Sequence, residues 1–175
     1  MTVRRMAIIS TFAALIAVSA FIQVPIGAVS FTLQTLFVIL AGLILKPQDA
    51  FLSVLIYLTV GLIGIPVFTT GGGPQAFVSY TGGFLIGFLF VSIGISIFKS
   101  RNKNLLIDIP VILLFGLVVL YLFGITVYSS VAHTSIIASI TAFVPYYVWD
   151  IVKIVLAYCV YYVIPDDVVN KFFKY

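Results

Sequence analysis

The sequence predicts an all-α integral membrane protein that crosses the bilayer six times, and composition and apolar runs carry this prediction. Only 8% of the residues are charged, whereas a soluble domain has about 25%. The apolar residues gather in six runs, and a membrane-spanning helix needs about 20 residues. Since only short connections separate the runs, residues 1–175 are predicted to form a single membrane domain. The runs cover about residues 6–24, 31–45, 50–65, 81–98, 109–128 and 145–164.

The first run has features of a signal peptide, and the second and third runs are shorter than the others. The first follows Arg4 and Arg5 and contains the small residues VSA at 18–20, a pattern also found in cleavable signal peptides. We expect this run to remain in the protein as the first helix. The second and third runs are short and contain Gly42 and Gly61. Short, glycine-interrupted spans suit a binding cavity at modest depth from the outside.

Lysine and arginine residues are confined to alternate connections between the runs, apart from Lys153. Because positive charge favours the cytoplasmic side of a membrane, both termini are predicted to be cytoplasmic. This distribution argues for a multi-pass membrane protein and against a nucleic-acid-binding protein. The residues concerned are Arg4, Arg5, Lys46, Lys99, Arg101, Lys103, Lys171 and Lys174.

The three remaining connections are predicted to face outside, and they are rich in Gly, Pro, Ser and Thr. They cover residues 23–35, 64–83 and 128–145. Irregular backbone at membrane depth is tolerated only where protein buries it or a cavity wets it, so we expect re-entrant or folded loops over the helices. The segment TTGGGPQAFVSYTGG is expected to close over a ligand, with Gly72 and Gly73 allowing close approach. Its GGGP lacks the Gly-Lys-Ser/Thr of a nucleotide-phosphate loop, so no ATPase is expected in this chain.

Two ionisable residues inside the sixth run, Asp150 and Lys153, are the main candidates for a site. A charge in the membrane interior costs several kcal/mol and marks a functional site by default. Three residues apart on a helix, the two side chains share one face with Tyr146 and Trp149. Lys153 would attract an anionic group, while Asp150 would accept hydrogen bonds from ligand N–H groups. Alternatively, the pair neutralises itself or Lys153 extends to the surface, and the two aromatic residues anchor the helix at the interface.

Further candidates for ligand contact are uncharged. Gln34 and Thr35 open the second run and offer hydrogen-bond donors and acceptors, although Gln34 also suits a helix cap. Tyr80 and Gly82 lie at the end of the glycine-rich loop. Glycines in such loops also serve as turn formers or helix-packing residues.

Enzyme chemistry finds little support in the sequence. The chain has no glutamate, no HExxH and no GxSxG, which are the usual signatures of hydrolytic sites. His133 has no nearby Cys or Asp with ligand spacing. We therefore expect neither a catalytic residue nor a metal ligand.

Small residues form a strip in the first run. Ala13, Ala17 and Ala20 recur at helical spacing, and small side chains let a second helix pack closely in a membrane. The neighbour is either another subunit or a helix of the same chain.

Several segments in this order resemble the BioY family, the biotin-specific S component of energy-coupling factor (ECF) transporters. They are QVPIGAVSFTLQTLFVILAGLIL, GLIGIPVF followed by TTGGG, TGGFLIGF, YLFG and VPYYVWDIVK. The sixth helix of the family usually opens with Pro-aromatic-x-Pro-Gly-Asp. This chain keeps Pro145 and Tyr146 but has Val148 and Trp149 where the family has Pro-Gly, which predicts a more aromatic rim.

The resemblance implies a six-span subunit that binds biotin from outside and needs no cofactor. It also implies partners, namely a membrane coupling subunit that contacts Ala13, Ala17 and Ala20, and two cytoplasmic ATPases. The carboxylate of biotin is expected near Lys153 and its ureido group near Asp150. An S component for another small vitamin and, from a different class, an intramembrane enzyme are the alternatives.

Overall fold

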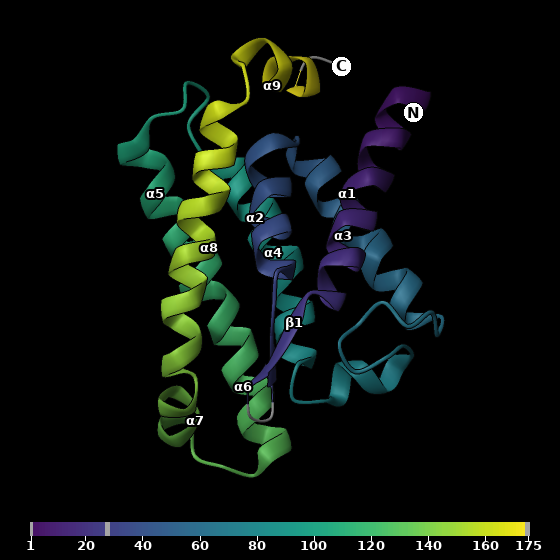
Figure 1. Ribbon diagram of the computed structural model, residues 1–175, viewed down its shortest axis with the longest axis vertical. Coiled ribbons are helices and arrows are strands. Elements are labelled where there is room, and N and C mark those ends of the chain that lie inside the picture. The colour runs from purple at the N-terminus through teal and green to yellow at the C-terminus, as the bar shows by residue number, and fades with distance from the viewer. Residues whose placement is uncertain (1, 27–28, 174–175) are drawn as a thin grey trace.

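The protein is a bundle of apolar helices in the computed structural model, which describes residues 2–26 and 29–173. Three helical stretches are long and apolar enough to cross a membrane: α1 (Val3–Phe21), the continuous stretch Leu105–Ala132, and α8 (Val144–Val163). Three shorter apolar helices complete the bundle: α2 (Gln34–Ile44), α3 (Pro47–Leu62) and α4 (Gly82–Phe98). Each of the six predicted runs therefore falls on one of these helical stretches (Figure 1).

The stretch Leu105–Ala132 changes its winding along its length. It comprises α5 (Leu105–Leu113), the π-helical turn η2 (Leu114–Val119) and α6 (Leu120–Ala132). Pro110 inside α5 removes a backbone donor from the helical hydrogen-bond ladder. In η2, a Cβ added at Gly116 would lie 3.2 Å from Ile39 Cδ1 of α2 and 3.6 Å from Ile154 Cδ1 of α8. The π turn therefore packs closely between two helices.

A β-hairpin joins α1 to α2 where the sequence predicted a folded loop. Strands β1 (Gln23–Ile26) and β2 (Val29–Thr32) pair antiparallel, with Val24 opposite Phe31. Pro25 cannot donate a ladder hydrogen bond, which a two-stranded ribbon tolerates because each strand is an edge. In Figure 1 the hairpin lies between α1 and α8. It also contacts α8, since the Tyr146 hydroxyl donates to the Val29 carbonyl over 2.5 Å.

The connection between α3 and α4 folds onto itself around buried aromatic rings. Phe68 packs edge-on against Tyr57 and Phe77, with ring centroids 5.4 Å and 5.6 Å away. The Gly73 N–H donates to the Gly61 carbonyl over 2.7 Å, and Gly73 has a φ of +98°, which glycine adopts without steric cost. The turn η1 (Pro74–Val78) then leads to α4. These contacts favour a packed loop.

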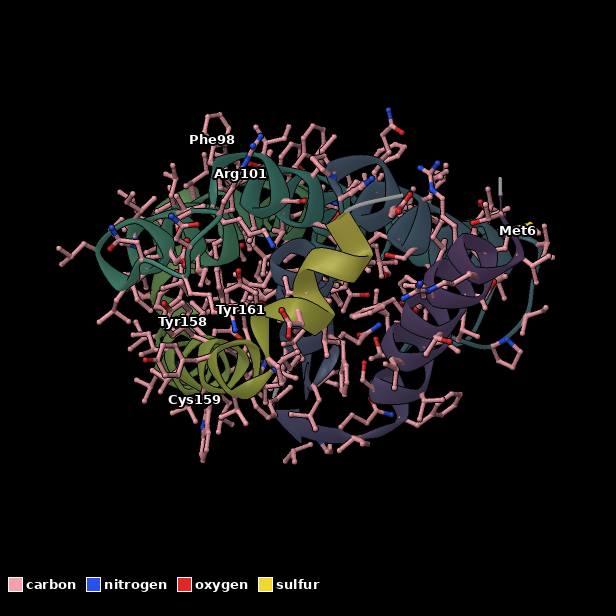
Figure 2. All side chains as sticks on the ribbon, turned by 90° about the horizontal axis from the view of Figure 1, so that it is seen from above. Met6, Phe98, Arg101, Tyr158, Cys159 and Tyr161 are labelled. Atoms are coloured by element: carbon pink, nitrogen blue, oxygen red, sulfur yellow. The ribbon has the colours of Figure 1, made fainter. Side chains whose placement is uncertain are left out.

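Helix α4 provides the centre of the bundle, packing on α2, α3 and α6. Glycines permit the close approach: a Cβ on Gly42 would lie 2.9 Å from the Ser92 carbonyl, and one on Gly83 would lie 2.1 Å from the Phe123 carbonyl. Seen from above, Tyr161 of α8 lies inside the bundle, whereas the exposed Cys159 points outward (Figure 2). The helices thus bury one face and leave an apolar face outside.

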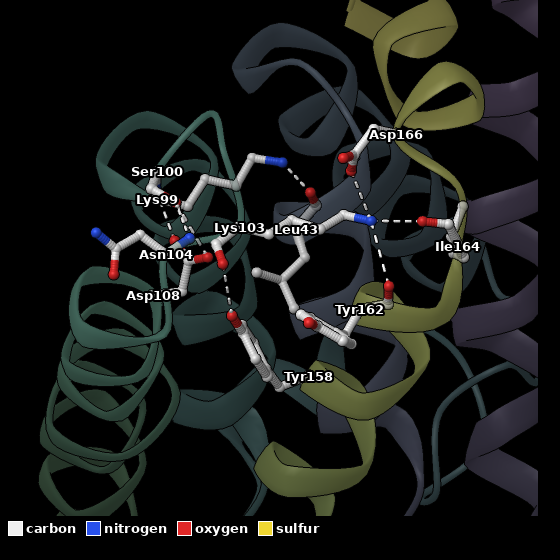
Figure 3. Close-up of polar contacts among 10 residues, drawn as sticks. All are labelled: Leu43, Lys99, Ser100, Lys103, Asn104, Asp108, Tyr158, Tyr162, Ile164 and Asp166. Carbon is white, nitrogen blue, oxygen red and sulfur yellow. Dashed lines mark hydrogen bonds and ion pairs between the residues drawn. The ribbon is translucent and has the colours of Figure 1, made fainter.

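Two lysines of the α4–α5 loop cap the ends of helices from different parts of the chain (Figure 3). Lys99 Nζ donates to the Leu43 carbonyl at the end of α2. Lys103 Nζ donates to the Ile164 carbonyl that follows α8 and pairs with Asp166 at 2.8 Å. Positive groups are favourable at helix C-termini, where backbone carbonyls lack intrahelical partners. The loop therefore ties α2 to α8 and to α9 (Asp166–Phe173).

The N-terminal end of α1, the α4–α5 loop and α9 lie at one end of the molecule (Figure 1), and the first two carry Arg4, Arg5, Lys99, Arg101 and Lys103. Arg5 of α1 pairs there with the buried Asp49 of α3, with Nη2 and Oδ1 2.5 Å apart. The opposite end holds the hairpin, η1 and α7 (Ile136–Ala142). Lys174, which the sequence places among the same basic residues, lies outside the described residues.

Candidate ligand-binding site

A cavity lies against strand β2 of the hairpin, at the end of the bundle away from the N-terminus and α9. It encloses about 520 Å³ of space free of protein atoms, including the part open to solvent. Strand β2 forms one wall, and α2, α4, α6 and α8 form the others. The lining residues are Val29, Ser30, Phe31, Thr32, Gln34, Thr35, Thr69, Thr81, Phe84, Leu85, Phe88, Tyr121, Phe143, Tyr146, Asp150 and Lys153.

Asp150 and Lys153 form a buried ion pair in the wall of this cavity. Lys153 Nζ donates to Asp150 Oδ1 over 2.6 Å, and the two side chains are 5% and 7% exposed. The ring of Phe31 covers the ammonium from another side, with its centroid 4.0 Å from Nζ. Lys153 therefore does not extend to the surface. The pair balances its own charge and at the same time faces the cavity.

Tyr121 is a site residue that sequence reasoning did not identify as one. Its hydroxyl donates to Asp150 Oδ2 over 2.5 Å, and its ring packs edge-on against Phe84 and Phe143. The only sequence signal was its place in the family-like YLFG segment. Its role depends on the contact between α6 and α8, which are separated by the α7 connection.

The amide of Gln34 is held in a fixed orientation. Its Nε2 donates to the Tyr57 hydroxyl over 2.5 Å, and its Oε1 accepts from Thr32 Oγ1 over 3.1 Å. Gln34 is the first residue of α2, and no side-chain hydrogen bond caps this end of the helix. Gln34 therefore does not act as a helix cap. Thr35 follows it in the cavity wall.

Five predicted binding residues do not line the cavity. A Cβ on Gly72 would lie 2.5 Å from the Ile65 carbonyl, and one on Gly82 would lie 2.0 Å from the Phe77 carbonyl, so both are explained by close backbone packing. Gly73 occupies the turn described above. Tyr80 lies against Tyr128, at a ring distance of 5.6 Å, and Trp149 lies against Phe31, at 5.7 Å. A role for these five in binding, and loop closure over a ligand, stay predictions.

The alanine strip of α1 faces largely into the protein. Ala13 and Ala20 are 6% and 2% exposed, and Ala17 is partly buried against the core. The burial of Ala13 and Ala20 favours the alternative of a neighbour within the same chain, and their contact with a coupling subunit stays a prediction.

The cavity groups can bind a ligand that is polar at defined points and apolar between them. Lys153 has donors beyond the one given to Asp150, and the Asp150 carboxylate has two lone-pair positions beyond those that accept from Tyr121 and Lys153. Phe84, Phe88 and Phe143 provide apolar surface. No cluster of three His, Cys, Asp or Glu side chains occurs among the described residues. The arrangement suits recognition of a small molecule with N–H groups and an anionic or carbonyl group.

Apolar helices around a cavity with a buried ion pair define a ligand-binding membrane protein. A family model described as the BioY family matches residues 1–169, and the chain belongs to this family. The "Biotin transporter BioY" of Thermotoga maritima is 35% identical over 147 residues, which cover 83% of this chain and 86% of that protein. The "Probable biotin transporter BioY" of Lysinibacillus sphaericus is 46% identical over 96 residues, which cover 55% of this chain and 49% of that protein.

The fold has a close relative among solved structures. The crystal structure of "the S-component for biotin from an ECF-type ABC transporter" superposes with a TM-score of 0.79 at 28% sequence identity, covering 92% of both chains. The resemblance to the BioY family in the sequence is therefore confirmed.

Proposed function

We propose that this chain is the biotin-binding membrane subunit of an ECF transporter. The observation that carries the proposal is the buried Asp150–Lys153 pair in the wall of a cavity that strand β2 and four helices enclose. An intramembrane pair of this kind marks a ligand site or pathway. The chain belongs to a family in which relatives are named biotin transporters, and this supports biotin as the ligand.

The chemistry of biotin matches the groups in the cavity. Biotin has one carboxylate, two ureido N–H donors, a ureido carbonyl and an apolar bicycle. The carboxylate is assigned to Lys153 and the ureido N–H groups to Asp150, while the phenylalanine rings of the cavity contact the bicycle. The fixed amide of Gln34 and the hydroxyl of Thr35 offer the remaining polar contacts.

The proposal includes an orientation and partners. Six helical stretches span the bacterial plasma membrane, with the basic end and both termini in the cytoplasm. The cavity then opens toward the outside. A membrane coupling subunit and two cytoplasmic ATPases supply the energy, since no nucleotide-phosphate loop is present in this sequence. Contact with the coupling subunit is assigned to α1, which carries the strip of Ala13, Ala17 and Ala20.

The test is to identify what the purified protein binds. Small molecules released by denaturation are identified by mass spectrometry, and labelled biotin is titrated in the presence of competing vitamins. The proposal expects saturable binding of biotin, released chemically unchanged. Preferential binding of another vitamin would favour the sister S component, and a modified product would favour the enzyme.

A further inference from the structure

Tyr57 of α3 lies behind the wall of the cavity and contacts the site through Gln34. Gln34 Nε2 donates to the Tyr57 hydroxyl over 2.5 Å, and Gln34 lines the cavity whereas Tyr57 does not. Tyr57 is 1% exposed, and its ring packs edge-on against Phe68, with the ring centroids 5.4 Å apart. The hydroxyl is therefore held at a fixed point next to a residue of the site.

The contacts of Gln34 give its side-chain amide a defined polarity. Thr32 Oγ1 accepts from the Gln34 backbone N–H over 3.3 Å, and its own hydrogen is donated to Gln34 Oε1 over 3.1 Å. The amide oxygen thus faces Thr32, and the amide nitrogen faces Tyr57. A primary amide has two N–H donors and two acceptor lone pairs, so one N–H group and one lone pair remain after these contacts.

The remaining N–H group of Gln34 suits the one polar atom of the ureido ring that the ion pair does not bind. Asp150 is assigned to the ureido N–H groups of biotin and Lys153 to the carboxylate, so the ureido oxygen still needs a donor. We propose that Tyr57 is a positioning residue, which holds the free N–H group of Gln34 toward this oxygen and thereby selects a ligand with an acceptor at this point. The inference rests on the proposed function for its ligand.

The position of Gln34 on α2 does not by itself fix the orientation of its amide. The last torsion of a glutamine side chain is broad, so neighbouring groups decide which way the amide faces. Tyr57→Phe keeps the ring and its packing but removes the acceptor of one N–H group. A buried donor without an acceptor disfavours its orientation by about 5- to 150-fold. The released amide then rotates and can also offer its oxygen to a ligand.

A pair of ligands separates positioning of the amide from a general loss of structure. In 2-iminobiotin a protonated imino group replaces the ureido carbonyl, so an acceptor becomes a donor while the rest of the molecule is unchanged. The affinities for biotin and 2-iminobiotin are measured with the purified wild-type protein and with the Tyr57→Phe and Tyr161→Phe variants. Tyr161 is also 1% exposed and does not line the cavity, so it provides the matched control.

The two ligands should respond differently to Tyr57→Phe. We expect the affinity for biotin to fall by about 3- to 10-fold, because the donor for its ureido oxygen is no longer held in place. The affinity for 2-iminobiotin should stay the same or rise, because the rotated amide accepts from the imino group. Tyr161→Phe should leave both affinities unchanged. An equal loss for the two ligands in Tyr57→Phe, or no loss for biotin, would overturn the inference.

A double-mutant cycle tests whether Tyr57 acts through Gln34. In the Gln34→Ala background the amide is absent, so adding Tyr57→Phe should not lower the affinity for biotin further. A purely structural role of Tyr57 would lower this affinity by the same factor in both backgrounds, and that result would overturn the inference. If the wild-type protein does not bind biotin, the proposed function fails, and selection for the ureido oxygen fails with it.

NMR spectra of the side-chain amides test the contact between Tyr57 and Gln34 without any ligand. Gln34→Ala identifies the signals of Gln34 among those of the glutamines. Tyr57→Phe should shift these signals, whereas Tyr161→Phe should leave them at their wild-type positions. Unchanged signals in Tyr57→Phe would contradict the contact. Shifted signals in a protein that does not bind biotin would trace the failure to the proposed function.

Discussion

At the scale of single residues, the site is organised around one carboxylate. Asp150 accepts from Lys153 on one oxygen and from Tyr121 on the other. A buried carboxylate needs such partners because desolvation of an unpaired charge is costly. Lys153 and Tyr121 also fix the orientation of the Asp150 carboxylate, and therefore the direction of its remaining lone pairs. The site is thus formed before a ligand binds.

Tyr121→Phe removes the hydroxyl that orients Asp150 and leaves the ring packing intact. Hydrogen bonds to charged groups contribute about 1.5–3 kcal/mol, so biotin affinity should fall by about 10-fold or more. The measurement is equilibrium binding to the purified variant. Tyr162→Phe is the matched control, because Tyr162 is exposed, does not line the cavity and should keep wild-type affinity. Equal affinities for Tyr121→Phe and the wild type would show that this hydrogen bond does not support the site.

At the scale of elements, sequence periodicity and hydropathy predicted the helices well and the short elements poorly. The run at 145–164 corresponds to α8 (Val144–Val163), and the run at 31–45 contains α2 (Gln34–Ile44). The hairpin was missed because its strands have only four residues each, and such short strands gain their stability from tertiary contacts. The helices thus reflect local composition, whereas the wall of the cavity reflects packing.

The same distinction applies to the site. Asp150 and Lys153 were identified because charge within an apolar run is conspicuous. Tyr121 and Phe31 carry no such signal, and they become site residues only when α6 and β2 meet α8. Gly72 and Gly82 were predicted to allow close approach of a ligand. Something does approach both glycines closely, but it is the backbone of this chain.

Helix α1 gives a prediction about the alanine strip. Ala13→Leu inserts three carbon atoms into a packed core, which typically costs about 1–3 kcal/mol, so thermal stability and biotin binding should decline together. Ala14→Leu, on the exposed face of the same helix, should keep both. The measurements are melting temperature, biotin affinity and cellular uptake. If Ala13→Leu lost only uptake, Ala13 would be a contact for the coupling subunit.

At the scale of the whole molecule, the two ends have different chemistry. One end holds the cavity and its aromatic rim, while the other is closed by polar contacts between helix ends. Asp108 is fully buried there and accepts from the Ser100 N–H over 2.6 Å, which fixes the loop that carries Lys99 and Lys103. This loop connects α2 and α8, the same two helices that contribute Gln34 and Asp150 to the cavity.

Lys99 makes the stability of this closed end dependent on pH. Burial lowers the pKa of Lys99 to about 7 from 10.5, with Asp108 opposing the shift and Lys103 adding to it. At pH values between these two pKa values, Lys99 is protonated in the unfolded chain but mostly neutral in the folded one. The free energy of unfolding should therefore rise with pH, by at most about 1.4 kcal/mol per pH unit. Denaturation in mixed micelles from pH 7 to 9 measures this rise. Lys99→Met should flatten it, whereas Arg101→Met, in the same loop, should retain it.

The measurement that tests the central claim most directly is biotin affinity after separate substitution of the two members of the buried pair. In Asp150→Asn and Lys153→Met, one charge stays buried without its partner and one ligand contact is lost, which costs about 2–5 kcal/mol. We therefore expect affinity to fall by about 30-fold or more in each variant, while Arg101→Met, which removes an exposed charge, binds like the wild type. Wild-type affinity in a folded Asp150→Asn or Lys153→Met protein would contradict the account.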